Sequence, residues 1–426
     1  MATTTTAREV RVTAFGMPAT LSLETVPVPT PGADEVVVQM RMAPVNPAGE
    51  RAAAHARLAL HPGVARCVRF AEGAPWLVAQ RVSWPASWRA TERACRATAP
   101  HGSLEHYPVV SCPARSIFPA CSYRSRSTTT AAADIFSLMG VYPGAKMATP
   151  AVPGLEGMGV VAAVGADVAD VVHVGQRVVP LFIFSDAYLK AGRGSWADFV
   201  VFKAAHVCPV PDGVSDEAAA QFVVNPWTAY AMLKELNAPA GAYVVQTAAG
   251  SVLGRQLIQM ARHLGLRTIN IVRRAEAAAE LKALGADEVL VHGADDIAAR
   301  VRKLTGGAGA WGGVDCVGAE WTATVTSCVR NGGTVFVYGA MSGLQFTGSI
   351  VDLTFRDVAL RGFWITPFIS TRGVEYCHRL AAEVWPLLAA GVVTPYTGDV
   401  FPLERVAEAV AASTAAGRGG KVLLRM

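Results

Sequence analysis

The chain has 426 residues, of which 52% are hydrophobic and 17% charged. This length can bury the cores of two domains, and no apolar run reaches the roughly 18 residues that a membrane-spanning helix needs. Eight cysteines without a CxxC pair disfavour a disulfide scaffold. The net charge of +5 is uneven, because residues 50–132 carry +7 and the rest −2, so nothing outside that segment indicates nucleic-acid binding. We therefore expect a soluble α/β enzyme.

The N-terminal residues alternate between apolar and polar positions, as antiparallel strands do. EVRVTAF, LSLETVPVP and DEVVVQMRMAPVNPAG follow one another in residues 9–49, and the pattern resumes at Asp134 with DIFSLMGVYPG. Two further segments, PAVPGLEGMGVVAAVG and VGQRVVPLF, are punctuated by Gly and Pro, which predicts short strands of a small barrel. Only MATTTTAR precedes this pattern, which is too short for an ordinary transit peptide. The protein is therefore expected to be cytosolic, or its true N-terminus is missing.

Residues 50–132 have no sustained helical or strand period. They lack Lys, Asn, Asp and Met, and contain 11 Arg, three Trp and half of the chain's cysteines. Lys, Asn and Met need AT-rich codons, so this bias is typical of translated GC-rich noncoding DNA. We predict a disordered, Arg-rich insertion that arose as a retained intron; a genuine surface insertion and a functional module are the alternatives. Tryptic peptides from residues 57–124 of the native protein would exclude the intron.

From about Ser215 the period changes. SDEAAAQFVVNPWTAYAMLKEL predicts one amphipathic helix leading into the short buried strand AYVVQTA. Strands and helices then alternate to about residue 368, which predicts a parallel sheet. The helix VEYCHRLAAEVWPLLAAG and the strand KVLLRM end the chain.

The strongest motif is the strand–turn–helix sequence at 242–264. Its turn, residues 248–254, reads AAGSVLG, and the helix behind it places Leu253, Leu257, Met260, Ala261 and Leu264 on one face. Small residues let a backbone approach a pyrophosphate, and a helix N-terminus offers free N–H groups. The turn departs from GxGxxG at its first two Gly places, and any tight turn between a strand and a helix also favours small residues.

Two arginines follow the second strand of this unit. Arg273 and Arg274 end RTINIVRR, where an NAD enzyme usually presents Asp or Glu to the ribose 2′-hydroxyl. Guanidinium groups pair with a 2′-phosphate, so this position favours NADPH over NADH; a solvated pair of charges at a helix start is the alternative. Farther on, VDCVG (314–318) and GGTVFVYGAMSG (332–343) predict strands that turn on Gly. Residues 338–341 either form one wall of the nicotinamide site or are simply the turn at the end of a strand.

The sequence lacks the metal ligands of a zinc dehydrogenase of this layout. Such an enzyme would have Cys at Asn46 and His-Glu at Leu155-Glu156, because Zn²⁺ prefers thiolate and imidazole ligands. Cys67, Cys95, Cys112 and Cys121 are too irregularly spaced for a structural zinc lobe. We expect no metal.

The chain resembles the zinc-independent medium-chain dehydrogenase/reductase superfamily, and within it the mitochondrial trans-2-enoyl-thioester reductases. The likeness covers nearly all of residues 8–49 and 133–426. It is carried by VNPA (45–48), ADIFSLMGVYPG (133–144), PGLEGMGVVAAVG (153–165), VVNPWTAYAML (223–233), LRTINIVRR (266–274), YGAM (338–341) and LRGFW (360–364). NPWTAY with LRGFW is fairly specific to the subfamily, whereas the dinucleotide-binding part is shared by the superfamily.

The resemblance implies an α/β fold, with a doubly wound parallel Rossmann sheet (222–368) and a GroES-like mainly-β catalytic domain. The catalytic domain would comprise residues 1–49 and 133–221, and residues 369–426 would return to it. The family's proton-donating tyrosine falls on Tyr142. Its NADPH contacts fall on Asn225, Gly250, Ser251, Val252, Leu253, Arg273, Arg274, Ala275, Tyr338, Gly339, Ala340, Met341, Phe363, Trp364, Ile365, Thr366 and Lys421. Ala275 departs from a basic family position.

The implied reaction is NADPH-dependent reduction of the 2,3-double bond of a trans-2-enoyl thioester, carried on acyl-carrier protein or CoA, in fatty-acid synthesis. Tyr142 would protonate the α-carbon, since a phenol is neutral at pH 7. An NADPH:quinone or enone oxidoreductase and a non-catalytic NADPH-binding protein are the alternatives. The resemblance also implies a homodimer and a mitochondrial address, with the cytoplasm as the alternative.

Overall fold

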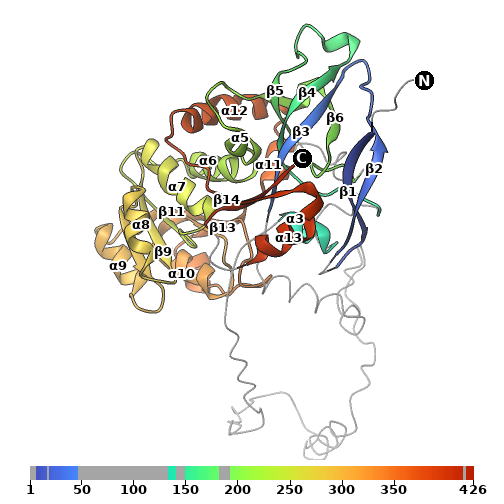
Figure 1. Cartoon of the computed structure of the whole chain (residues 1–426). Coiled ribbons are helices and arrows are strands. Elements are labelled where there is room, and N and C mark those ends of the chain that lie inside the picture. The colour runs from blue at the N-terminus through green and yellow to red at the C-terminus, as the bar shows by residue number, and fades with distance from the viewer. Residues whose placement is uncertain (1–5, 17–18, 47–132, 141–148, 182–191, 416–418) are drawn as a thin grey trace, which may run out of the picture. The chain divides into compact units, whose positions relative to one another are not determined.

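The computed structural model describes residues 6–16, 19–46, 133–140, 149–181, 192–415 and 419–426 (Figure 1). The chain divides into two units, Met1–Leu60 with Ser127–Met426, and His61–Arg126. The second unit lies wholly outside the described residues. The expectations for residues 50–132, a disordered insertion or a retained intron, therefore stay predictions.

The β-rich part of the first unit is built on a sheet with the path β14-β15-β3-β4-β5-β7, from which β6 pairs with β3. All its pairs are antiparallel except β14 with β15. The strands are β3 (Glu35–Val45), β4 (Met158–Val164), β5 (Arg177–Pro180), β6 (Phe199–Lys203), β7 (Val207–Pro209), β14 (Thr397–Pro402) and β15 (Lys421–Arg425). A separate hairpin joins β1 (Thr6–Ala14) to β2 (Thr20–Pro27). The strands predicted between residues 9 and 45 are confirmed.

A second, fully parallel sheet has the order β10-β9-β8-β11-β12-β13. Numbered within the sheet, this is 3-2-1-4-5-6, the order of doubly wound dinucleotide-binding folds. The strands are β8 (Tyr243–Gln246), β9 (Arg267–Val272), β10 (Glu288–Val291), β11 (Ala310–Asp315), β12 (Val329–Val337) and β13 (Ala359–Gly362). The predicted α/β fold, a doubly wound sheet beside a mainly-β part, is confirmed.

Helices cover both faces of the parallel sheet. Val244 of β8 packs into a core with α6 (Val224–Leu236), α7 (Val252–His263) and α12 (Val374–Ala389), while its neighbour Val245 packs with α9 (Ile297–Leu304) and α10 (Glu320–Cys328) on the other face. Alternate residues of one strand therefore serve two cores. The remaining helices are α3 (Ala133–Leu138), α5 (Asp216–Ala220), α8 (Ala277–Ala283), α11 (Ile365–Ser370), α13 (Val406–Thr414), the 3₁₀ turns Ala166–Val168, Ala204–His206 and Leu403–Arg405, and the π-helical turn Val351–Phe355.

The single amphipathic helix expected over residues 215–236 is wrong in two respects. The structure has two helices, α5 and α6, and α6 is buried along most of its length, from Pro226 to Leu233. Pro226 explains the break, because a residue without a backbone N–H fits only the first turn of a helix.

The C-terminal segment, residues 369–426, contributes to both parts of the fold. Strands β14 and β15 join the sheet that contains β3, whereas α12 packs against α6.

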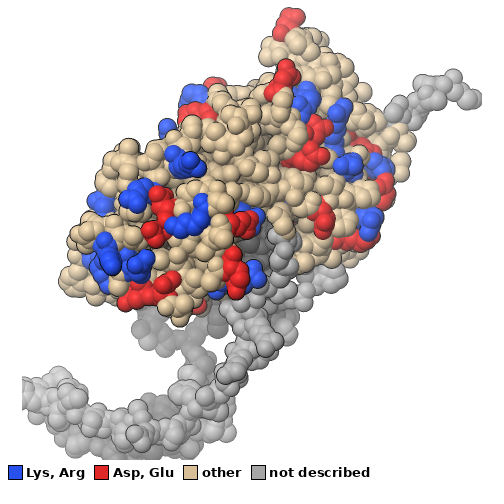
Figure 2. All heavy atoms as spheres, turned by 60° about the vertical axis from the view of Figure 1, so that its left-hand side comes forward, with Lys and Arg blue, Asp and Glu red and all other residues tan. Residues whose placement is uncertain are grey.

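No helix in the described part of the chain is both long and apolar enough to cross a bilayer. On the face drawn in Figure 2, basic and acidic side chains of the described residues alternate over the surface. Neither sign gathers into one continuous area on that face.

Candidate cofactor and substrate site

The 248–254 turn connects β8 to α7 as the sequence predicts. Ser251 caps the helix, because its hydroxyl accepts a hydrogen bond from the Gly254 N–H at 3.1 Å. A Cβ at Gly254 would lie 2.7 Å from the carbonyl oxygens of Ala248 and Ala249, so only glycine lets the helix pack this closely on the turn. A Cβ at Gly250 would meet nothing within 4 Å. The turn thus leaves open space at Gly250 in front of the first N–H groups of α7, which have no partner within the helix.

Asp315, which the sequence analysis did not single out, ties this turn to the neighbouring strand end. Its carboxylate is fully buried and accepts hydrogen bonds from the hydroxyls of Thr247 and Thr322 at 2.6 and 2.7 Å, and from the Gly318 N–H at 3.2 Å. Thr247 directly precedes the 248–254 turn. In the sequence, Asp315 could have been recognised as the single acidic residue between an apolar strand and Gly318.

Arg273 and Arg274 follow the end of β9 and are exposed, as is Ala275. β9 lies beside β8 with Asn270 opposite Gln246, and their side chains share a 2.7 Å hydrogen bond. Because the carboxyl ends of parallel strands meet at one edge of the sheet, both arginines emerge at the same edge as the 248–254 turn.

Residues 338–341 follow β12 and are tied back to β11. The Tyr338 and Met341 N–H groups donate to the carbonyl oxygens of Asp315 and Cys316, each at 2.9 Å. Burial beside the Cys316 thiol raises the pKa of Tyr338 well above its ordinary value. Gly339 and Ala340 stay partly exposed. The segment is therefore held at the carboxyl edge of the sheet, where a dinucleotide would lie.

Residues 363–366 connect β13 to α11. Phe363 donates its N–H to the Val337 carbonyl at 2.8 Å, while Trp364 is 38% exposed and Ile365 is buried. The Thr366 hydroxyl is buried and has no hydrogen-bond partner among the described residues. An unpartnered buried hydroxyl is costly, so a bound group that completes it would be stabilised there.

Glu156, another residue that the sequence analysis did not assign, connects Lys421 to the first turn of α6, which carries Asn225. The Lys421 ammonium lies 2.7 Å from one Glu156 oxygen, and both side chains are almost fully buried. The other Glu156 oxygen accepts the N–H of Val224 at 2.8 Å, directly before the half-buried Asn225 at the start of α6. The signal was an acidic residue within the glycine-rich run PGLEGMG.

Asn46 and Asp134 meet beside this pair. One Asp134 oxygen accepts the backbone N–H and the side-chain amide of Asn46, at 2.8 and 2.9 Å. Leu155, at the position where a zinc dehydrogenase has His, is buried in the apolar core. Within the described ranges no group of three or more His, Cys, Asp or Glu side chains could hold a metal ion.

Tyr142, the predicted proton donor, lies outside the described residues. The structure places only the helix before it, α3, and the turn at Gly140, whose φ of +71° and 2.9 Å approach to Phe15 favour glycine. The described cysteines, Cys208, Cys316, Cys328 and Cys377, are buried and free. Burial raises the pKa of Cys316 to about 12 and that of Cys328 to about 11, so neither is a thiolate at neutral pH.

The described residues fit a dinucleotide. The open Gly250, the capped start of α7 and the exposed Arg273 and Arg274 lie at one sheet edge, as a pyrophosphate and a further phosphate require. In the part of the chain that the structure describes, the buried hydroxyl of Thr366 has no hydrogen-bond partner, so a bound ligand could supply one.

Two family models match the chain. A zinc-binding dehydrogenase model covers residues 252–376, and an alcohol dehydrogenase GroES-like domain model covers residues 124–212. The enoyl-[acyl-carrier-protein] reductase, mitochondrial, of Caenorhabditis elegans is 37% identical over 267 residues, which is 61% of this chain and 73% of that protein.

Solved structures give the same fold. A mycobacterial quinone oxidoreductase superposes with a TM-score of 0.68 at 25% identity, covering 99% of this chain and 100% of that one. A mycobacterial protein complexed with NADPH gives a TM-score of 0.66 at 24% identity, with the same coverage. The chain therefore belongs to the medium-chain dehydrogenase/reductase superfamily, whose members similar to it in sequence include mitochondrial enoyl-[acyl-carrier-protein] reductases.

Proposed function

We propose that the protein is an NADPH-dependent reductase of the 2,3-double bond of trans-2-enoyl thioesters, acting in fatty-acid synthesis. The observation that carries the cofactor is the pair of exposed arginines, Arg273 and Arg274, at the sheet edge that also carries the 248–254 turn. The substrate class rests on the likeness to an enoyl-[acyl-carrier-protein] reductase.

NADPH supplies the hydride when bound, so the protein's own residues have to orient it and manage charge and protons. The start of α7 and the two arginines would hold its phosphates. Glu156 fixes the Lys421 ammonium and the first turn of α6, so that Lys421 and Asn225 would be preorganised to contact the cofactor. Residues 338–341 and 363–366 would line the nicotinamide end.

Reduction of an enoyl thioester leaves negative charge on the carbonyl oxygen and requires a proton at the α-carbon. Backbone N–H groups or the cofactor ribose would stabilise the oxygen. Tyr142 would give the proton from its phenol, which is neutral at pH 7. Tyr142→Phe should then lower turnover by orders of magnitude while NADPH binding persists; unchanged turnover would exclude Tyr142.

The second candidate function is an NADPH:quinone or enone oxidoreductase, favoured by the fold shared with a mycobacterial quinone oxidoreductase. A non-catalytic NADPH-binding protein is the third. The deciding experiment follows NADPH oxidation by the full chain with 2-enoyl thioesters of increasing length, on CoA and on acyl-carrier protein, and with quinones. Preference for thioesters supports the proposed function, preference for quinones replaces it, and binding without turnover of either leaves the third.

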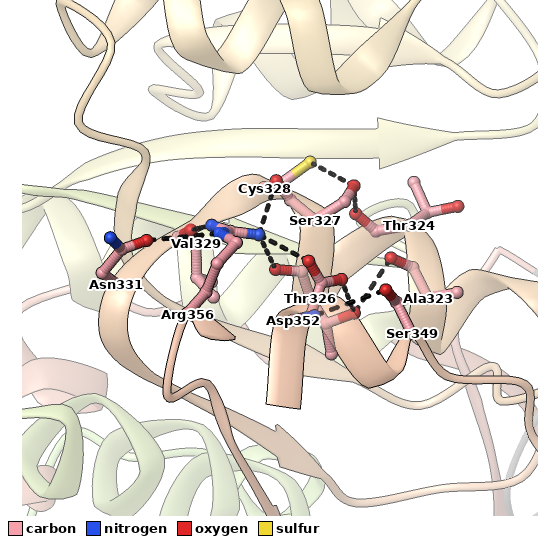
Figure 3. Close-up of polar contacts among 10 residues, drawn as sticks. All are labelled: Ala323, Thr324, Thr326, Ser327, Cys328, Val329, Asn331, Ser349, Asp352 and Arg356. Atoms are coloured by element: carbon pink, nitrogen blue, oxygen red, sulfur yellow. Dashed lines mark hydrogen bonds and ion pairs between the residues drawn. The ribbon is translucent and has the colours of Figure 1, made fainter. Parts of the chain in front are cut away.

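A homodimer in the mitochondrion is part of the proposal. Its candidate interface combines the edge strand β13 with the apolar segment before it, in which Phe346, Ile350 and Phe355 are 52%, 71% and 77% exposed. A buried polar network holds this segment in place (Figure 3): Asp352 accepts from the Thr326 hydroxyl at 2.9 Å and pairs with Arg356 at 2.8 Å. Apolar side chains on an anchored segment are typical of interaction surfaces. The mitochondrial address rests on the name of the related enzyme.

A further inference from the structure

Three ionisable side chains lie buried together where β3, α3 and β15 meet. Asp134 and Glu156 are 0% exposed and Lys421 is 4% exposed; they are called the Asp134 cluster below. The pairing of Val422 with Val45 sets the register of β15 on β3 and brings Lys421 level with Asn46, the partner of Asp134.

The cluster contains two carboxylates and one ammonium. Glu156 uses both oxygens, one on Lys421 at 2.7 Å and one on the Val224 N–H at 2.8 Å. Among the described residues, Asp134 uses one oxygen, which accepts both hydrogen bonds from Asn46, and its Oδ1 is buried without a partner. Lys421 is therefore neutralised by Glu156, and an ionised Asp134 would be an uncompensated buried charge.

Such a group titrates near neutrality. Burial raises the pKa of Asp134, the hydrogen bonds from Asn46 oppose this rise, and Glu156 and Lys421 act in opposite directions, so that the pKa lies at about 7. Glu156 and Lys421 are the charged groups that act on Asp134 among the described residues. The net charge of the cluster thus changes from zero to −1 as the pH rises through this range.

We propose that Asp134 discriminates between the two redox forms of the nicotinamide cofactor, its ionised form favouring NADP⁺ over NADPH. This rests on the proposed function, in which Lys421 contacts the cofactor. The oxidised ring carries a positive charge that the reduced ring lacks. Asn46, which donates both hydrogen bonds to Asp134, also occupies the position at which a zinc dehydrogenase of this layout has a metal ligand, so in this proposal the cluster lies on the side of the site where the ring would meet the substrate.

The direction of the pH effect on cofactor binding follows from the charge of the cluster. Below the pKa of Asp134 the cluster is neutral and treats the two ring charges alike. Above it, the added negative charge attracts the NADP⁺ ring. The ratio Kd(NADPH)/Kd(NADP⁺) therefore rises with pH. Unit charges in a partly buried site interact strongly enough to change an affinity roughly tenfold, and one proton limits the slope to about tenfold per pH unit.

The test measures both dissociation constants by calorimetry on the full chain at pH 6, 7 and 8. The ratio removes the titration of the 2′-phosphate, which both cofactor forms share. We expect a rise of roughly three- to tenfold from pH 6 to 8 in the wild type. In Asp134→Asn the ratio should be flat and close to the wild-type value at pH 6, because an amide keeps the bonds to Asn46 and mimics the protonated acid. A flat wild-type ratio, or an equal slope in Asp134→Asn, overturns the inference.

Asp352→Asn is the matched control, since it removes a different buried carboxylate, the partner of Arg356 (Figure 3). It should keep the wild-type slope. If Asp134→Asn does not fold, Asp134→Ser is the second neutral variant. A wild-type ratio Kd(NADPH)/Kd(NADP⁺) that does not change with pH overturns the inference without any variant. Failure of both cofactor forms to bind refutes the proposed cofactor and this inference with it. Binding without turnover refutes only the proposed reaction, because the pH dependence of the ratio needs no substrate.

Discussion

Replacing Arg273 and Arg274 with alanine, singly and together, should reduce the preference of the enzyme for NADPH over NADH. Both side chains are exposed at the end of β9, and a guanidinium pairs with a 2′-phosphate through charge-assisted hydrogen bonds. NADH has a hydroxyl at this place, so its binding should not depend on either arginine.

The magnitude follows from the exposure of the site. A hydrogen bond to a charged group contributes about 1.5–3 kcal/mol, and solvent screening at exposed residues favours the lower end. About 1.4 kcal/mol is a factor of ten. We therefore expect kcat/KM for NADPH to fall roughly tenfold in each single variant and roughly 100-fold in the double variant.

The assay compares kcat/KM for NADPH and NADH with one enoyl thioester, at low and at physiological salt. The NADPH value of the wild type should decline with salt, and that of the double variant should not. Arg405→Ala removes an exposed arginine of the Leu403–Arg405 turn and is the control. An equal loss with both cofactors would indicate damage to the fold, and an unchanged NADPH value would refute the assignment of these arginines.

Further variants test other parts of the structure. Gly254→Ala should lower the free energy of unfolding by about 1–3 kcal/mol, because its Cβ lies 2.7 Å from two carbonyl oxygens, whereas Gly250→Ala should leave the melting temperature unchanged and weaken NADPH binding. Since burial raises the pKa of Asp134 from 3.8 to about 7, the folded state holds the extra proton between these values, and stability falls as the pH rises through them. The whole window amounts to about 4 kcal/mol, of which roughly 2–3 kcal/mol falls between pH 5 and pH 8. Asp134→Asn should gain about that much stability relative to the wild type at pH 8 compared with pH 5 in urea titrations; an equal difference at both pH values would contradict it. Phe355→Asp should shift the mass measured by light scattering from dimer to monomer, while the exposed Val171→Asp should not.

Much of the Rossmann part could be predicted from the sequence because its signals are local. Strand β9 matches RTINIV residue for residue, and Leu253, Leu257, Met260 and Ala261 of α7 are buried on the predicted face. Strand period, a capping Ser251 and a required Gly254 all act within a few residues of one another. The break between α5 and α6 also has a local cause, Pro226, but the continuous apolar pattern of residues 215–236 predicts a single helix.

The polar connections of the site could not be predicted in this way, because they join residues far apart in the chain. Glu156 meets Lys421 across 265 positions, and Thr247 meets Asp315 across 68. A single buried acid within an apolar run is visible in the sequence, but its partner depends on the register of β15 on β3. That register is a property of the folded sheet.

The hydrogen bonds between Asn46 and Asp134 have a consequence for gene structure and for engineering of the chain. Two hydrogen bonds to the Asp134 carboxylate and one from the Ile135 N–H to the Asn46 carbonyl, at 3.4 Å, hold position 46 against positions 134 and 135. Because Asn46 and Asp134 lie within hydrogen-bonding distance, a short connection could join them without rearrangement of β3 or α3. Since the entropy of closing a loop grows only with the logarithm of its length, the same point also tolerates a long segment. We therefore expect that sequence can be added or deleted between Asn46 and Asp134 while the hydrogen bonds between these two residues are kept.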